Sequence, residues 1–138
     1  MNTYKYENIY VGLSHSFQVR VDQKEQDSFS NITGDVNPLH RDVAFAKKKG
    51  YEDCVVFGML TASYYSTLAG VYLPGENSLI HGVDAKFLKP VFVGDTLTVE
   101  GKVSEKNDTY KLLIIKASIR NQDGEKVSRA TIRVGVLE

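Results

Sequence analysis

The segment from 58 to 73 constrains the fold more than any other part of the sequence. Its apolar residues go most of the way round a helix instead of forming one stripe: Met59, Leu60, Ala62, Tyr64, Tyr65, Leu68, Ala69, Val71 and Tyr72. A helix that is apolar on nearly every side must be surrounded by protein. Glycine, serine and threonine residues interrupt the segment, which makes it unlike a membrane span. We therefore expect a buried helix that Pro74-Gly75 ends.

The rest of the sequence is typical of β-strands on both sides of this helix. Alternating apolar and polar residues predict one strand before it and four after it, at 14–21, 79–91, 96–103, 110–120 and 127–137. Asp123-Gly124 predicts a hairpin turn between the last two strands. One buried helix and several long antiparallel strands form an α+β fold, in which the sheet wraps around the helix.

Two short helices are predicted between the first strand and the buried helix. Asp22 followed by Glu25 is a capping-box pattern that begins the first of them. Asp42 caps the second, which Gly50 ends. The residues between the two helices, 33–38, are rich in turn-forming types, and a loop is expected there.

Size and charge exclude several classes of protein. The 138 residues contain no repeat or linker and fit a single domain, 1–138. Seventeen basic residues balance seventeen acidic ones, so no basic face is expected that would bind nucleic acid. Cys54 is the only cysteine, which excludes an intrachain disulfide and a cysteine-rich metal site. The N-terminus shows no secretory signal pattern, so we expect a cytoplasmic location with no membrane association.

The loop between the short helices contains the one histidine that has candidate partners. Asp35 and His40 lie five residues apart, and Pro38 bends the chain between them. Such a bend can turn a carboxylate and an imidazole toward one small molecule, where they could move a proton to and from water near neutral pH. The same spacing is equally compatible with an aspartate that caps a turn and an exposed histidine.

Three segments resemble known sequences in order and spacing. The longest, FSNITGDVNPLHRD at 29–42, resembles the signature of the (R)-specific enoyl-CoA hydratases of the MaoC-like dehydratase family. FGMLTAS at 57–63 resembles the start of that family's central helix, and KPVFVGDTL at 89–97 resembles its strand turn. With the strands that follow, the resemblance covers nearly the whole chain. It implies the hotdog fold, in which an antiparallel sheet wraps around a long central helix.

The resemblance also implies catalytic roles for particular residues. Asp35 and His40 match the family's acid/base pair, which holds one water and adds it reversibly to a 2-enoyl thioester. Asn37 is expected to orient the loop. The backbone N–H of Gly58 is expected to bind the thioester oxygen, a task that suits a helix N-terminus because its N–H groups favour negative charge. No metal and no organic cofactor is implied.

The family resemblance further implies a substrate pocket and an assembly. Ser66 and Ala69 share a helix face with small side chains, and in this family that face lines the acyl pocket. Phe57 takes the place of a histidine that is common in the family, so any polar contact made by that histidine is lost, which bears on substrate identity. The expected substrate is a thioester of coenzyme A or of acyl carrier protein, and the expected assembly is a homodimer.

Two other functions are compatible with the sequence. A hotdog thioesterase would hydrolyse the thioester, but the Gly-Asp-x-Asn-Pro-Leu-His pattern is typical of the hydratases. A non-catalytic acyl-binding domain is favoured by Phe57 and disfavoured by the intact Asp35 and His40. The three functions differ in outcome, because hydration bleaches the enoyl-thioester absorbance, hydrolysis releases a free thiol, and a binding protein does neither.

Overall fold

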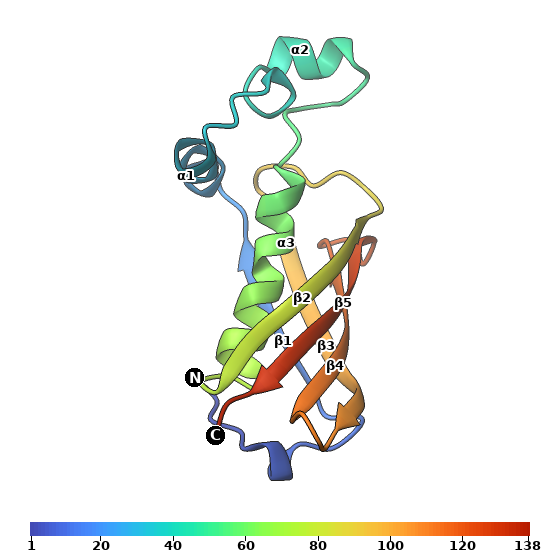
Figure 1. Ribbon diagram of the computed structural model, residues 1–138. Helices are drawn as coiled ribbons and strands as arrows, with labels where there is room; N and C mark the ends of the chain where they lie inside the picture. Colours follow the sequence, from blue (N-terminus) through green and yellow to red (C-terminus); the bar gives the residue numbers. More distant parts are fainter.

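The computed structural model describes residues 1–138 and consists of one antiparallel sheet, a helix that it wraps around, and two further helices (Figure 1). In chain order the elements are β1 (Ser14–Arg20), α1 (Gln23–Thr33), α2 (Val43–Lys48), α3 (Gly58–Thr67), β2 (Ser78–Phe87), β3 (Thr96–Asn107), β4 (Leu112–Arg120) and β5 (Lys126–Val136). None of the helices combines the length and the apolar character that a membrane span requires. The α+β fold expected from the sequence is confirmed.

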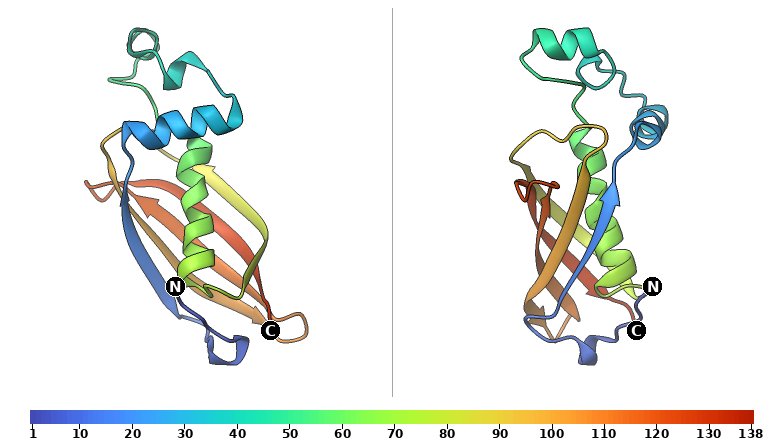
Figure 2. Two further views of the ribbon diagram at one scale, coloured as in Figure 1. Left: turned by 90° about the vertical axis from the view of Figure 1, so that its left-hand side faces the viewer. Right: turned by 180° about the vertical axis from the view of Figure 1, so that it is seen from behind.

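The five strands form a single sheet in the order β1-β3-β4-β5-β2, and every neighbouring pair is antiparallel. β1 and β2 therefore form the two edges of the sheet. The sheet curves so that its concave side encloses α3 (Figure 2). The turn at Asp123-Gly124 joins β4 to β5, as predicted.

The core lies between α3 and the concave face of the sheet. Tyr65 and Leu68 are fully buried on the helix, against apolar side chains that alternate along the strands. Gly101 on β3 allows the close approach, because a Cβ there would lie 2.6 Å from Leu68 Cδ2 and 3.0 Å from Ile115 Cγ2. Burial of this face provides most of the free energy that holds the helix on the sheet.

Most expected element boundaries agree with the structure within two residues, and three elements differ from their expected form by more than that. The α-helix ends at Thr67 and continues as a π-helical turn, Leu68–Tyr72. β2 ends at Phe87, before Pro90, which lacks the N–H that a strand needs. β3 runs on to Asn107 beyond a register shift after Val103, where the alternation of apolar residues is interrupted.

The central helix is also less enclosed than its sequence predicts. Met59, Ser63 and Ser66 form an exposed row along α3, and 66 % of Met59 is exposed. The neighbouring edge strand β2 exposes Val83 and Phe87 beside this row. Within one chain the sheet therefore covers one side of α3. An apolar strip formed by α3 and β2 remains exposed on the other side.

The two short helices lie beyond one end of the sheet, over the N-terminal end of α3 (Figure 2). The predicted caps are present: Asp22 and Glu25 form the capping box of α1, and Asp42 accepts a hydrogen bond of 3.1 Å from the Phe45 N–H. Gly34 ends α1 with a φ of +74°, a conformation that favours glycine. The chain then turns into the segment that carries Asp35 and His40.

Candidate active site

The loop from Asp35 to His40 is held by its own side chains. The Asp35 carboxylate accepts a hydrogen bond of 3.0 Å from the Asn37 N–H, and the Asn37 side-chain oxygen accepts one of 3.0 Å from the Leu39 N–H. Ser30 on α1 donates to the Asp35 carbonyl at 2.7 Å. Pro38 begins a 3-10 turn that ends at His40. Asn37 therefore lies where it can orient the loop.

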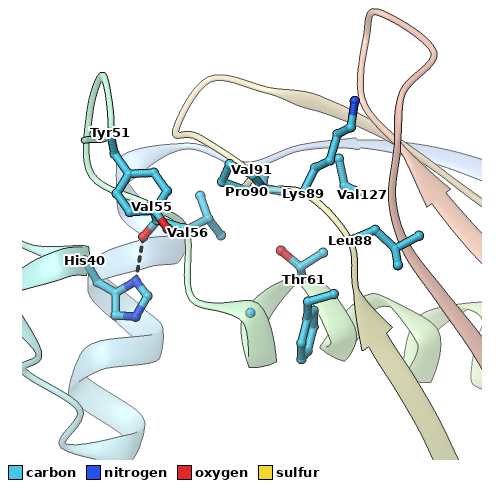
Figure 3. A pocket seen from close by; sticks show the side chains of 12 residues that line it. His40, Tyr51, Val55, Val56, Thr61, Leu88, Lys89, Pro90, Val91 and Val127 are labelled. Atoms are coloured by element: carbon cyan, nitrogen blue, oxygen red, sulfur yellow. Dashed lines mark hydrogen bonds between the residues drawn. The ribbon is translucent and has the colours of Figure 1, made fainter. Parts of the chain in front are cut away.

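His40 is oriented by the backbone next to α3. Its Nδ1 lies 2.6 Å from the Val55 carbonyl oxygen (Figure 3). A carbonyl only accepts, so Nδ1 donates in this contact, and Nε2 is left to face the site and exchange a proton with water. The ring also stacks on Phe57, with 4.2 Å between centroids. Phe57 thus serves as a packing surface for the imidazole.

Gln26 ties these elements together and was not identified from the sequence. Its side chain is 1 % exposed, and its amide nitrogen donates to the carbonyls of His40 at 3.0 Å and of Val55 at 3.1 Å. Its oxygen accepts from the Phe57 N–H at 3.2 Å. Because α1 is short and polar, nothing in the sequence distinguishes this glutamine from an exposed one.

One hollow of about 400 Å³ brings the candidate catalytic groups together. Its lining includes Asp35, His40 and Gly58, and the remaining wall consists of Phe29, Thr33, Phe57, Met59 and Phe87. Gly58 begins α3, whose first N–H groups have no partner within the helix. A carboxylate, an imidazole and a helix N-terminus facing one space can transfer a proton and stabilise a developing oxyanion.

Phe87, at the end of β2, borders this site and was also missed by the sequence analysis. A Cβ built on Gly58 would lie 3.4 Å from the Phe87 ring, so the ring covers the start of α3. Tyr65 supports this end of β2 from the core, because its hydroxyl donates to Ser128, which donates to the Lys86 carbonyl. Burial raises the pKa of Tyr65 to about 12, which keeps its hydroxyl protonated as a donor.

Two further hollows adjoin the first, and Phe87 lines all three. One, of about 390 Å³, lies between α3 and β2 and is bordered by Met59, Ala62, Ser63, Ser66, Ile80, Val83, Ala85 and Phe87. The other, of about 350 Å³, lies between His40 and the segment that follows β2 (Figure 3). Ser66 thus lines a hollow, whereas Ala69 is fully buried in the core and lines none of the three.

Other ionisable groups form no metal centre. No group of three or more His, Cys, Asp or Glu side chains could hold a metal ion. Cys54, next to Val55, is partly buried, and this burial together with Asp53 and Asp42 raises the pKa of its thiol. A thiol with a raised pKa is a poor nucleophile.

Comparison with known proteins finds related sequences over most of the chain. A sequence profile described as MaoC like domain matches residues 11–123. The chain is 36% identical over 118 residues to an (R)-specific enoyl-CoA hydratase of Aeromonas caviae, covering 86% of this chain and 88% of that one. It is 30% identical over 100 residues to a 3-hydroxybutyryl-CoA dehydratase of Methylorubrum extorquens, covering 72% of this chain and 64% of that enzyme.

Among solved structures, the chain is similar to the (R)-hydratase of A. caviae involved in PHA biosynthesis. The TM-score is 0.90 at 33% sequence identity, and the match covers 94% of this chain and 98% of the other. The hotdog fold expected from the sequence motifs is thereby confirmed.

Proposed function

Because the chain belongs to the MaoC-like domain family, we propose that it catalyses the reversible hydration of 2-enoyl thioesters to (R)-3-hydroxyacyl thioesters. The observation that carries the proposal is the hollow that Asp35, His40 and the N-terminus of α3 share. The names of the hydratase and dehydratase relatives support the same chemistry in its two directions.

In this mechanism Asp35 and His40 hold one water between them. The pair removes a proton from the water as its oxygen forms a bond to the β-carbon, and the electrons of the double bond move to the thioester oxygen as an enolate. The Gly58 N–H stabilises that oxyanion at the helix N-terminus. The pair then delivers a proton to the α-carbon, so that one water is added in total. The reverse sequence dehydrates the product.

Phe57 shapes the site without taking part in proton transfer. Its ring is buried, stacks on His40 and contacts Phe29 at 4.9 Å between centroids. A phenyl ring here donates no hydrogen bond, so the polar contact expected of a histidine is absent. The backbone donor at Gly58 does not depend on this side chain, and the hydration chemistry is therefore retained.

The test is an assay with crotonyl-CoA, followed at the absorbance of the conjugated thioester. Hydration bleaches this absorbance without releasing thiol, and chiral analysis of the product gives the (R)-3-hydroxy isomer. Release of free coenzyme A would identify a thioesterase instead. Binding of the substrate with neither change would identify an acyl-binding domain.

The uncovered strip of α3 and β2 supports assembly as a homodimer. Of the two edge strands, β1 exposes mainly polar side chains, whereas β2 exposes Leu79, Val83 and Phe87. An apolar edge strand is normally paired or covered. We expect light scattering at micromolar concentration to give twice the mass of one chain, and Val83→Lys to give the monomer mass. A wild-type protein that is monomeric under these conditions would contradict this assembly.

The acyl chain is proposed to occupy the hollow between α3 and β2, which Ser66 lines. Ser66→Leu should fill this space and lower the kcat/KM for octenoyl-CoA at least tenfold, since each excluded methylene matters by roughly 1 kcal/mol. Crotonyl-CoA, whose tail is short, should be affected little. Turnover of the two substrates measures the effect.

Ala69→Leu is the matched contrast, since Ala69 is packed in the core. The larger side chain should overpack the core, cost about 1–3 kcal/mol of stability and lower the turnover of both substrates equally. An equal loss for both substrates in Ser66→Leu would remove Ser66 from the pocket.

A further inference from the structure

One polar atom in the core has no hydrogen-bond partner. The hydroxyl of Thr61, on the second turn of α3, is buried within a side chain that is 2 % exposed, and nothing in the protein bonds to it. A threonine in a helix usually donates to the carbonyl four residues earlier. Here the Phe57 carbonyl accepts from the Thr61 backbone N–H, and no bond from the hydroxyl is formed. An unpaired buried hydroxyl destabilises the free protein.

The hydroxyl faces the hollow between His40 and the segment after β2. Figure 3 shows the Thr61 oxygen turned into the space bordered by Val56, Pro90 and Val91. The walls are largely apolar, and the polar side chains on the lining are His40, Tyr51, Thr61 and Lys89. The Lys89 ammonium is paired with Glu125 at the surface. An amphipathic ligand segment with a hydrogen-bonding group in its middle would complement such a wall.

The position of this hollow relative to the other two indicates what it binds. The hollow with Asp35 and His40 adjoins both neighbours, since it shares His40, Gly58 and Phe87 with one and Met59 and Phe87 with the other. The hollow along β2 is almost wholly apolar and suits a hydrocarbon tail. A thioester has two arms, and the second is the thiol portion, which begins with two methylenes and an amide in both coenzyme A and acyl carrier protein.

We propose that the Thr61 hydroxyl binds the first amide of this thiol arm. The inference rests on the proposed function, since it assumes a thioester whose oxygen lies at Gly58. Gly58 and Thr61 are three residues apart on α3. Residues with this spacing lie about 5–6 Å from each other on one face of a helix. The two methylenes between sulfur and amide bridge a comparable length. Bound substrate thus supplies the partner that Thr61 lacks in the free protein.

The experiment compares Thr61→Val, which keeps the shape and removes the hydroxyl, with Thr61→Ser, which keeps the hydroxyl. Thr67→Val, at the end of the same helix and outside the three hollows, is the matched control. Butyryl-CoA, which cannot be hydrated, reports binding by calorimetry. Kinetics use crotonyl-CoA, crotonyl-acyl carrier protein, S-crotonyl-N-acetylcysteamine, which retains the first amide, and S-ethyl crotonothioate, which has no amide.

For Thr61→Val we expect about tenfold weaker binding of butyryl-CoA and about tenfold higher KM for each amide-bearing substrate that the wild type accepts, with kcat unchanged. The kcat/KM for S-ethyl crotonothioate should stay within twofold. Thr61→Ser should restore binding, and the melting temperature of Thr61→Val should be equal to or above that of the wild type. The carrier on which the wild type is faster identifies the physiological thiol.

A loss of equal size on all thioesters, or a fall in kcat alone, would overturn the inference, because the hydroxyl would then act on the reacting atoms. Unchanged affinity for butyryl-CoA would overturn it as well. These outcomes are distinct from a failure of the proposed function, in which the wild type itself does not hydrate crotonyl-CoA. The calorimetric comparison decides on Thr61 in that case too.

Discussion

Replacing Asp35 by asparagine or His40 by alanine is expected to lower kcat for the hydration of crotonyl-CoA by about 100- to 10,000-fold. Asp35→Asn keeps the size of the side chain and removes the charge that attracts a proton, and His40→Ala removes the imidazole. If the two groups act on one water, the double variant should be little slower than either single variant. The measurement is steady-state kinetics of the three variants.

The fold of these variants should persist, because Asp35 is exposed on a loop and His40 is only partly buried. His81→Ala is the matched control, since it removes an exposed imidazole on β2 and should leave kcat unchanged. Near-normal turnover in Asp35→Asn or in His40→Ala, with an intact melting transition, would refute the acid/base pair. Strictly additive losses would show that the two groups act in separate steps.

Gln26→Leu is expected to lower the free energy of unfolding by about 3 kcal/mol or more, and to lower activity as well. The substitution leaves the His40 carbonyl and the Phe57 N–H without their partner, and it leaves the Val55 carbonyl with the His40 imidazole as its one remaining donor. Each unsatisfied buried group costs about 1–3 kcal/mol. The same contacts hold His40 against the start of α3, so the site should loosen with them.

Urea denaturation gives the stability, and crotonyl-CoA turnover gives the activity. Gln23→Leu is the control on the same helix, because Gln23 is exposed and bonds only to the side chain of Asp27 in the structure. It should change stability by no more than about 0.5 kcal/mol. Equal stability of the two variants would mean that water replaces the Gln26 amide, and would remove its role in positioning His40.

Much of the fold could be predicted because local patterns agree with it. The capping box at Asp22 and Glu25, the cap at Asp42 and the turn at Asp123-Gly124 each depend on neighbouring residues, and all were found as predicted. The strand order could not be predicted, because pairing of β1 with β3 and of β2 with β5 joins segments far apart in the sequence. The bulge after Val103 likewise depends on its partner strand.

The residues of the candidate site likewise fall into those that a local motif predicts and those that depend on distant contacts. Asp35 and His40 lie in one loop, so a sequence motif could associate them, and the structure places both on one hollow with Gly58. Gln26 and Phe87 reach the site through contacts with segments that are distant in the sequence, and their residue types carry no signal of their own. Ala69 was expected in the pocket from its spacing to Ser66, but the π-helical turn that begins at Leu68 places it in the core.

The shared wall at Phe87 has a consequence for how proteins of this kind can diverge. Because one ring borders all three hollows and covers Gly58, we expect a change at this position to affect the proposed tail site, thiol-arm site and oxyanion donor together. A substitution of Phe87 that adapts one hollow to a new substrate would therefore also change the other two. Positions that line a single hollow, such as Ser66 or Lys89, can vary independently, and substrate range is expected to evolve through them.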